Sequence, residues 1–268
     1  MAFALSVTTM TAKAQHTFAV TTGCGMATSR LYPAQETRPI WGAWQSGVSW
    51  RYYSLPRFVG CVGVDLEWMQ RGFSYAPYAS IYDNKKQYKY YRRNYNAFML
   101  PIVWQPHFYL FKNHLRVYLE AAVTFSCNFA PTFENREPYT FGSMNNQGLT
   151  VIEGKYKMRS ERDNRFCYGL AGGGGIDLLF GQVEVGVRVR YDFGYSDIMR
   201  NRNKYYDNGL DQQTNPGENP FWYTPLRSPL DNLTFSIKVG WRFNKEGFAE
   251  WDHKPQKRKN KEIIKFAL

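Results

Sequence analysis

Hydrophobic and polar positions alternate over long stretches of the chain, most clearly in QVEVGVRVRYDFGY, residues 182–195. Every odd position from Val183 to Tyr195 is apolar or aromatic, and every even position is charged, glutamine or glycine. Side chains on a β-strand point alternately to two faces, so this strand has one apolar face and one polar face. If the apolar face points inward, the pattern predicts a soluble barrel or sandwich. If it points outward, the solvent on that side is lipid.

The same two-residue period predicts eight strands. They cover residues 16–30, 41–53, 58–72, 94–109, 115–129, 166–179, 182–195 and 232–243. The connections alternate in length. The short ones are 54–57, 111–114 and 180–181, and the longer ones are 31–40, 73–93, 130–165 and 196–231. Short turns at one end and long loops at the other are typical of outer-membrane barrels. We therefore expect an all-β fold, an eight-stranded antiparallel up-and-down transmembrane β-barrel with short periplasmic turns and long extracellular loops.

Three further features favour lipid on the apolar side. Several strands have twelve or more residues, which is enough for a tilted strand to cross the hydrocarbon layer. Aromatic residues gather toward strand ends, as in the girdles of membrane barrels: Trp41, Trp44, Trp50, Tyr52, Tyr53, Trp104, Trp241 and Phe243. The last strand finishes in Trp241-Arg242-Phe243, an aromatic end that resembles the signal read by barrel-assembly machinery. The polar faces are therefore predicted to line the lumen.

Composition agrees with this interpretation. The chain has no run of about eighteen apolar residues, which excludes a membrane-spanning helix. Mean hydropathy is −0.52, which a barrel tolerates because half of each strand is polar. Residues 1–14 are predicted to be part of an export signal that ends in Ala12-Lys13-Ala14, residues 15–243 the barrel, and residues 244–268 a basic periplasmic tail.

Charged residues of both signs fall on the predicted inner faces. An eight-stranded barrel has an interior just wide enough to be filled by side chains, so we expect interlocked ion pairs, with a narrow ion path or proton relay as the alternative. The expected members are Asp65, Glu67, Arg116, Glu120, Asp177, Glu184, Arg188, Arg190, Lys238 and Arg242. The glycine run at 172–175 is interpreted as relief of crowding in a strand, because no helix follows it to form a phosphate loop.

The net charge of +12 has its excess outside the predicted strands. In a soluble protein the stretch NKKQYKYYRR, residues 84–93, would suggest nucleic-acid binding; on an extracellular loop it favours lipopolysaccharide phosphates or a partner protein, or is simply solvated. The tail would contact anionic lipid or an acidic partner, or be disordered. The contact candidates are Lys85, Lys86, Lys89, Arg92, Arg93, Lys257, Arg258 and Lys259.

From about Gln15 to Phe243 the chain resembles the outer-membrane β-barrel family of Bacteroidetes-type bacteria that is often labelled PorT-like. The matching stretches are AKAQ, NAFMLPIVW with Pro101, YGLAGGGGIDLL, VEVGVRVRYDFGYSDI and LTFSIKVGWRF. The resemblance implies an eight-stranded OmpA/OmpX-like barrel. Some members of this family serve the type IX secretion and gliding apparatus, and most have no assigned activity.

The sequence leaves three functions open. The first is a non-enzymatic barrel that is a structural element or accessory subunit of an outer-membrane complex, such as a secretion-type machine. The second is a surface receptor or adhesin that uses loops 130–165 and 196–231. The third is a lipid-A-modifying enzyme, which is disfavoured because none of the histidines, His16, His107, His114 and His253, has Ser and acid partners at a suitable spacing.

No cofactor or metal site is expected, because Cys24, Cys61, Cys127 and Cys167 show no metal-binding or redox spacing. Cys127 and Cys167 lie on adjacent predicted strands, but their opposite parity argues against a disulfide.

Overall fold

The computed structural model describes residues 15–32, 34, 36–53, 60–76, 90–111, 114–140, 147–155, 157–160, 163–200 and 226–243. The strands of this part are rich in β-branched and aromatic residues, which favour the pleated conformation. They are β1 (Gln15–Ser29), β2 (Glu36–Arg38), β3 (Ile40–Tyr53), β4 (Cys61–Ala76), β5 (Tyr90–Gln105), β6 (His107–Leu110), β7 (Leu115–Thr140), β8 (Gln147–Lys155), β9 (Phe166–Phe180), β10 (Val183–Gly194) and β11 (Leu230–Phe243). Within the described ranges, no helix is long and apolar enough to cross a membrane.

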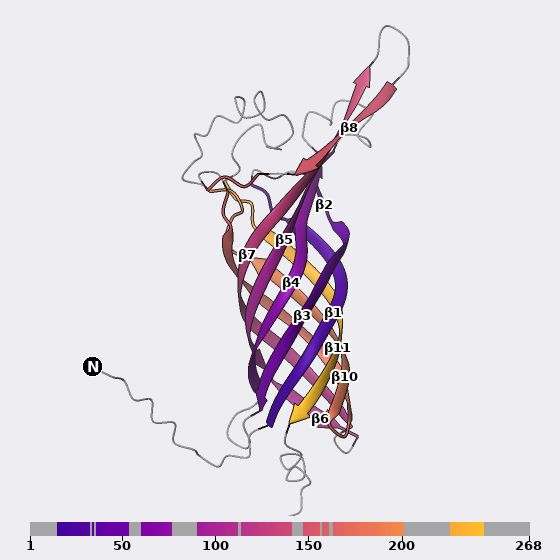
Figure 1. Ribbon diagram of the computed structural model, residues 1–268, viewed down its shortest axis with the longest axis vertical. Helices are drawn as coiled ribbons and strands as arrows, with labels where there is room; N and C mark the ends of the chain where they lie inside the picture. Colours follow the sequence, from indigo (N-terminus) through magenta and orange to yellow (C-terminus); the bar gives the residue numbers. More distant parts are fainter. Residues whose placement is uncertain are drawn as a thin grey trace, which may run out of the picture.

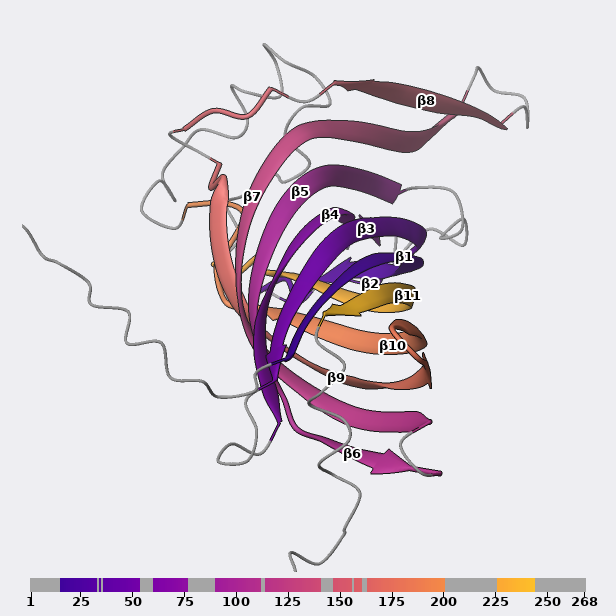
Figure 2. The same ribbon diagram turned by 60° about the horizontal axis from the view of Figure 1, so that its bottom comes forward.

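Eight long strands of the described chain close into a barrel (Figures 1 and 2). Around the wall their order is β1, β3, β4, β5, β7, β9, β10 and β11, and every neighbouring pair is antiparallel. The first and last strands pair from His16↔Phe243 to Ser29↔Leu230, which removes both sheet edges. This confirms the predicted fold class.

The two faces of the wall have the polarity that lipid requires. On β10, Val187 is 56% exposed, whereas the next residue, Arg188, is 2% exposed. The same alternation runs along β11, where Ile237 is exposed and Lys238 is buried. A continuous apolar outer surface around a charged interior is unstable in water and is the arrangement of outer-membrane barrels. The protein is therefore a transmembrane barrel of the bacterial outer membrane.

The apolar belt has the height of a hydrocarbon layer. On β11 its outward residues run from Leu233 to Phe243, ten residues apart. At roughly 3.3 Å per residue and a tilt of about 40°, this span covers about 25 Å of membrane. Exposed aromatic residues mark the extracellular margin of the belt, at Trp41, Trp44, Phe166, Tyr168 and Tyr195, and the turn margin, at Phe18, Trp104, Phe108, Phe111, Phe180, Trp241 and Phe243.

Short turns lie at the end where β1 begins and β11 ends. Gly181 connects β9 to β10 with φ at +59°, a conformation that favours glycine. The predicted strand 94–109 is interrupted within this end, because Pro106 has no N–H to donate to the ladder. The residues on either side of it, in β5 and β6, keep the same register with β7.

Two of the predicted extracellular loops are shorter than expected. β4 continues to Ala76 and β5 begins at Tyr90, so part of the predicted loop 73–93 is strand. β7 continues to Thr140 and forms a hairpin with β8, so the predicted loop 130–165 also contains paired strands. In Figure 1 this hairpin rises beyond the barrel at its upper end. The backbone hydrogen-bond ladder therefore continues above the membrane. There the outward side chains no longer need to be apolar, so the sequence pattern that predicts a strand is lost.

Candidate functional site

The ten charged residues predicted for the lumen all lie on inward positions and are buried, the most exposed being Lys238 at 6%. They lie on five strands of the barrel: β4, β7, β9, β10 and β11. The structure joins nine of them in ion pairs that fall into two groups, called here the central cluster and the turn-side cluster.

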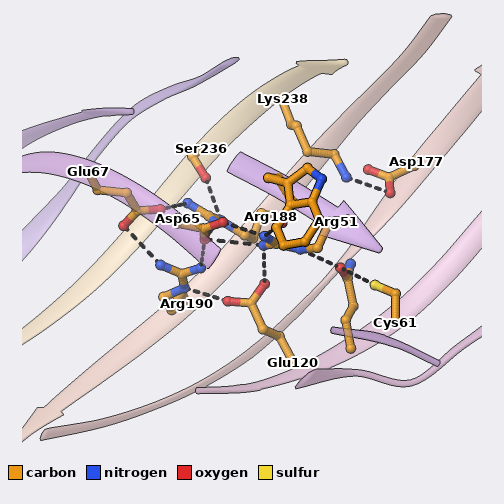
Figure 3. A network of polar contacts seen from close by, with 12 residues as sticks. Arg51, Cys61, Asp65, Glu67, Glu120, Asp177, Arg188, Arg190, Ser236 and Lys238 are labelled. Carbon is orange, nitrogen blue, oxygen red and sulfur yellow. Dashed lines mark hydrogen bonds and ion pairs between the residues drawn. The ribbon is translucent and has the colours of Figure 1, made fainter. Parts of the chain in front are cut away.

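The central cluster holds three carboxylates and three guanidinium groups (Figure 3). Its members are Asp65, Glu67, Glu120, Arg51, Arg188 and Arg190. Asp65 lies between all three arginines: it is bonded to Arg51, and its Oδ2 is 2.6 Å from Arg190 Nη2 and 3.2 Å from Arg188 Nη1. Arg188 and Arg190 each form a second ion pair, with Glu67, at 2.7 Å and 2.9 Å respectively. With three charges of each sign, the cluster is electrically neutral.

The turn-side cluster has two charges of each sign and is also neutral. Arg116 Nη2 bridges Asp177 at 2.6 Å and Glu184 at 2.7 Å. Lys238 Nζ contacts the same two carboxylates, at 2.8 and 3.3 Å. Arg242, the tenth predicted residue, donates to the carbonyl of Gly181 at the turn. Neutral groups are expected here because an unpaired charge is costly to bury.

Glycine in β9 allows the central cluster to form. Gly173 stands between Glu120 of β7 and Arg190 of β10 in the same rung. Because Gly173 has no side chain, Arg190 Nε reaches across β9 to Glu120 Oε1 at 2.5 Å. Gly175 does the same for Tyr118, whose hydroxyl would lie 2.5 Å from a Cβ at that position. The inward glycines Gly173 and Gly175 are thus needed so that long side chains can pass over the backbone of β9.

Replacing Gly173 with valine is expected to lower the free energy of unfolding by roughly 1–3 kcal/mol, through overpacking and loss of the Arg190–Glu120 contact. A Cβ there would fall on the Val189 carbonyl oxygen. Gly172→Val is the control, because its Cβ points to the outer face and meets only Glu120 O at 4.0 Å. Urea unfolding in detergent micelles compares them; equal midpoints for the two variants would contradict this role.

An apolar cap closes the extracellular end of the lumen. Its buried side chains come from the extracellular rim of the barrel and from the segment after β10: Leu31, Phe73, Tyr91, Tyr95, Ile198, Met199 and Leu230. Asp197 holds this segment in place by accepting from Ser228 N at 2.7 Å and Arg227 Nε at 3.1 Å. Directly below, Arg71 donates to the Leu230 carbonyl at 2.6 Å and to Asn232 Oδ1 at 3.1 Å. The lumen is therefore filled at three successive levels by described side chains.

The histidine and cysteine side chains of the described barrel wall make packing contacts and hydrogen bonds. The His107 ring lies between Tyr53 and Tyr109, with ring centroids 5.2 Å from each, and its Nδ1 is 3.2 Å from the Gln105 carbonyl. In the described part of the chain, no three His, Cys, Asp or Glu residues gather to hold a metal. The four cysteines are free thiols, and the register Ser126↔Cys167 puts Cys127 and Cys167 on opposite faces.

One predicted contact residue is wrong. Arg93 was expected on an extracellular loop, but it lies in β5 and is 0% exposed. It points inward, donates to Asn135 Oδ1 at 2.8 Å and lies 5.1 Å from the centroid of the Phe133 ring. The side chain is buried because the strand starts earlier than the basic run suggested. Arg92 is half-buried on the outward side of the same strand. The other candidates, Lys85, Lys86, Lys89, Lys257, Arg258 and Lys259, lie outside the described residues.

Besides Arg93, three inward charged residues of the described strands were missed: Arg51, Arg71 and Asp192 are all buried in the lumen. The alternation of their strands already assigned each of them to a polar face. Strand parity was therefore a sufficient signal, and Arg51 in particular completes the neutral central cluster.

No protein-family model and no curated protein sequence matches the chain. Among solved structures, Neisserial surface protein A (NspA) is similar at 8% identity, with a TM-score of 0.35 over 85% of this chain and 96% of that chain. Ail, the attachment invasion locus protein of Yersinia pestis, is similar at 10% identity, with a TM-score of 0.35 over 86% and 99%. OprG from Pseudomonas aeruginosa is similar at 12% identity, with a TM-score of 0.38 over 86% and 95%. The fold is therefore defined by this chain's own strand pairing, and membership of the PorT-like family stays a prediction.

Proposed function

We propose that this outer-membrane barrel is non-enzymatic and serves as an accessory subunit of an outer-membrane complex, with its extracellular end as the contact surface. The supporting observation is the β7–β8 hairpin. Nine residue pairs, from Thr132↔Lys155 to Thr140↔Gln147, continue the sheet beyond the part of β7 that pairs with β9. A filled lumen leaves the outer surfaces as the places where such a barrel can act.

The hairpin offers apolar side chains on both of its faces. Val151 and Ile152 are adjacent, so they point to opposite faces, and they are 46% and 43% exposed. Val151 is paired with Arg136, and Ile152 with Asn135, at the height of the barrel mouth. Exposed apolar residues on a strand that projects from the membrane are suited to contact with another protein. A secretion-type machine of the PorT-like kind is the complex that the sequence resemblance favours.

A surface receptor or adhesin is the second candidate. It is favoured by the concentration of long connections at the extracellular end, since binding residues are often carried by loops on a rigid scaffold. The two functions differ in whether a protein of the same envelope is bound at fixed stoichiometry.

Replacing Val151 and Ile152 together by serine is expected to reduce recovery of a stoichiometric partner at least tenfold, because the apolar contact on both hairpin faces is lost. The measurement is quantitative mass spectrometry of the tagged full-length protein, purified from native envelope in mild detergent. Leu226→Ser is the control, because Leu226 is an equally exposed extracellular residue outside the hairpin.

Both variants are expected to keep the heat-modifiable gel mobility of a folded barrel. Partner recovery that is unchanged in the double variant would exclude the hairpin as the contact. A wild-type protein that purifies without any stoichiometric partner would contradict the subunit function and favour the receptor.

A further inference from the structure

The barrel wall has an opening near its extracellular rim, between β3 and β4. The β3–β4 ladder ends at Gln45↔Met69, and pairing resumes at Arg38↔Ser74 through β2. Seven residue steps on the β2–β3 side therefore face five on the β4 side. The extra length is taken up at Gly42, which has φ at +76° and opposes no residue of β1. A cleft of about 320 Å³ lies at this bulge.

The cleft has a small apolar floor and a polar rim. The floor is formed by Ala27, Ile40 and Ala43, which are buried together. The rim carries three carboxamides, a hydroxyl, a guanidinium and an indole: Gln70, Asn94, Asn96, Thr132, Arg92 and Trp41. Trp41 is 72% exposed. A few convergent polar groups around an apolar floor are the usual composition of a small-ligand site.

Hydrogen bonds orient two of the polar rim groups. Gln70 Oε1 accepts from the backbone N–H of Trp44 at 3.2 Å, so its amide NH₂ is directed away from that contact. Arg92 donates from Nε to Asn94 Oδ1 at 3.2 Å, which holds its guanidinium group beside Asn94 at the cleft. Carboxamides and hydroxyls both donate and accept, as sugar hydroxyls do, and a guanidinium fork matches a phosphate.

The height of the cleft identifies the source of the ligand. Trp68↔Phe98 is the last apolar outward rung between β4 and β5, and Phe98 stacks on Phe129 with ring centroids 4.9 Å apart. The next outward rung is Gln70↔Asn96, two amides that line the cleft. The cleft therefore opens directly above the hydrocarbon belt, at the level of the lipid headgroups.

We propose that this cleft binds the phosphorylated sugar headgroup of a glycolipid in the outer leaflet. Arg92 contacts the phosphate, the amides of Gln70, Asn94 and Asn96 contact sugar hydroxyls, and the indole of Trp41 covers an apolar sugar face. This site is formed by β1, β3, β4, β5 and β7 at the extracellular rim of the wall. The residues replaced to test it differ from Val151 and Ile152, which carry the β7–β8 hairpin contact proposed above.

The test is native mass spectrometry of the full-length barrel in detergent, titrated with bis-phosphorylated lipid A. One lipid A molecule is expected to bind, and the double variant Arg92→Ala/Asn96→Ala is expected to weaken this binding at least tenfold. Both residues lie on the outer side of β5, so the barrel is expected to fold, which gel mobility verifies. Arg165→Ala is the control, because it removes an exposed extracellular arginine that does not line the cleft.

Three comparison probes define the ligand. Dephosphorylated lipid A and phosphatidylglycerol are each expected to bind at least tenfold more weakly than lipid A. Equal binding of the first would overturn the phosphate contact, and equal binding of the second would overturn recognition of the sugar. Soluble glucosamine 6-phosphate that binds as tightly as lipid A would overturn the assignment to a lipid of the leaflet.

Discussion

Replacing Asp65 with asparagine is expected to lower the free energy of unfolding of the barrel by about 3–5 kcal/mol, the range found when one partner of a buried ion pair is removed. Asp65 is fully buried and contacts Arg51, Arg188 and Arg190. The substitution preserves its shape but leaves three cations facing two carboxylates. The excess positive charge is buried, so contact with bulk solvent does not replace the lost partner.

The experiment is urea unfolding in lipid vesicles, followed by the different gel mobilities of folded and unfolded barrel. The matched comparison is the double variant Asp65→Asn/Arg188→Met, which returns the central cluster to two charges of each sign. We expect its loss to be at least about 2 kcal/mol smaller than the sum of the single losses, because the two sites are directly coupled. Strictly additive losses, or a wild-type midpoint for Asp65→Asn, would show that the three arginines do not depend on Asp65.

The neutrality of each cluster argues for a plug rather than a channel. A selective ion path usually presents a ring of one sign of charge to the passing ion. Here three carboxylates meet three guanidinium groups at one level, and Asp177 and Glu184 meet Arg116 and Lys238 at the next. The charged groups thus pair with one another inside the barrel, and the apolar cap lies above them. Polar side chains inside the barrel act as its core.

Strand alternation predicted the membrane-embedded part of the fold because lipid makes it unusually clear. Between Val183 and Phe193 every outward side chain must be apolar, and inward ones must fill a narrow lumen. The same rule fails above the membrane, where both faces of β7 and β8 are outside lipid. Residues such as Asn135 and Arg136 therefore resemble a loop although they are paired in a ladder. The last residues of the basic run, including Arg92 and Arg93, lie in β5 rather than in a loop for the same reason.

The pairing within the lumen was not predictable from local pattern. Parity placed Asp65 and Arg190 on inner faces, but they belong to β4 and β10, which are not neighbours in the wall. Their contact depends on how side chains of different length meet across the interior. Arg51 is another such case, because it lies in β3 while its carboxylate partners Asp65 and Glu120 lie in β4 and β7. The cleft at Gly42 depends on a register shift, which a single sequence does not specify.

Replacing Ile237 with arginine is expected to lower the free energy of unfolding by about 2–4 kcal/mol, the cost of a cation on the lipid face at the middle of a bilayer. Ile237 is exposed on the outer wall and lies near the midpoint of the apolar stretch of β11. Leu233→Arg is the matched control, since an aliphatic residue of the same size is replaced at the extracellular margin of the belt. There the expected loss is about 0–1 kcal/mol.

The comparison between these two depths separates lipid from water as the outer solvent. In a water-soluble barrel, Ile237 would be one of many exposed residues, and its replacement by arginine would change stability by about 0.5 kcal/mol or less. In the membrane, the arginine at position 237 must reach about half the bilayer thickness to find water, whereas at position 233 it snorkels to the interface. A large loss at the middle and a small one at the margin, measured in vesicles, requires lipid against the outer wall. Equal losses at both positions would contradict the assigned height of the belt.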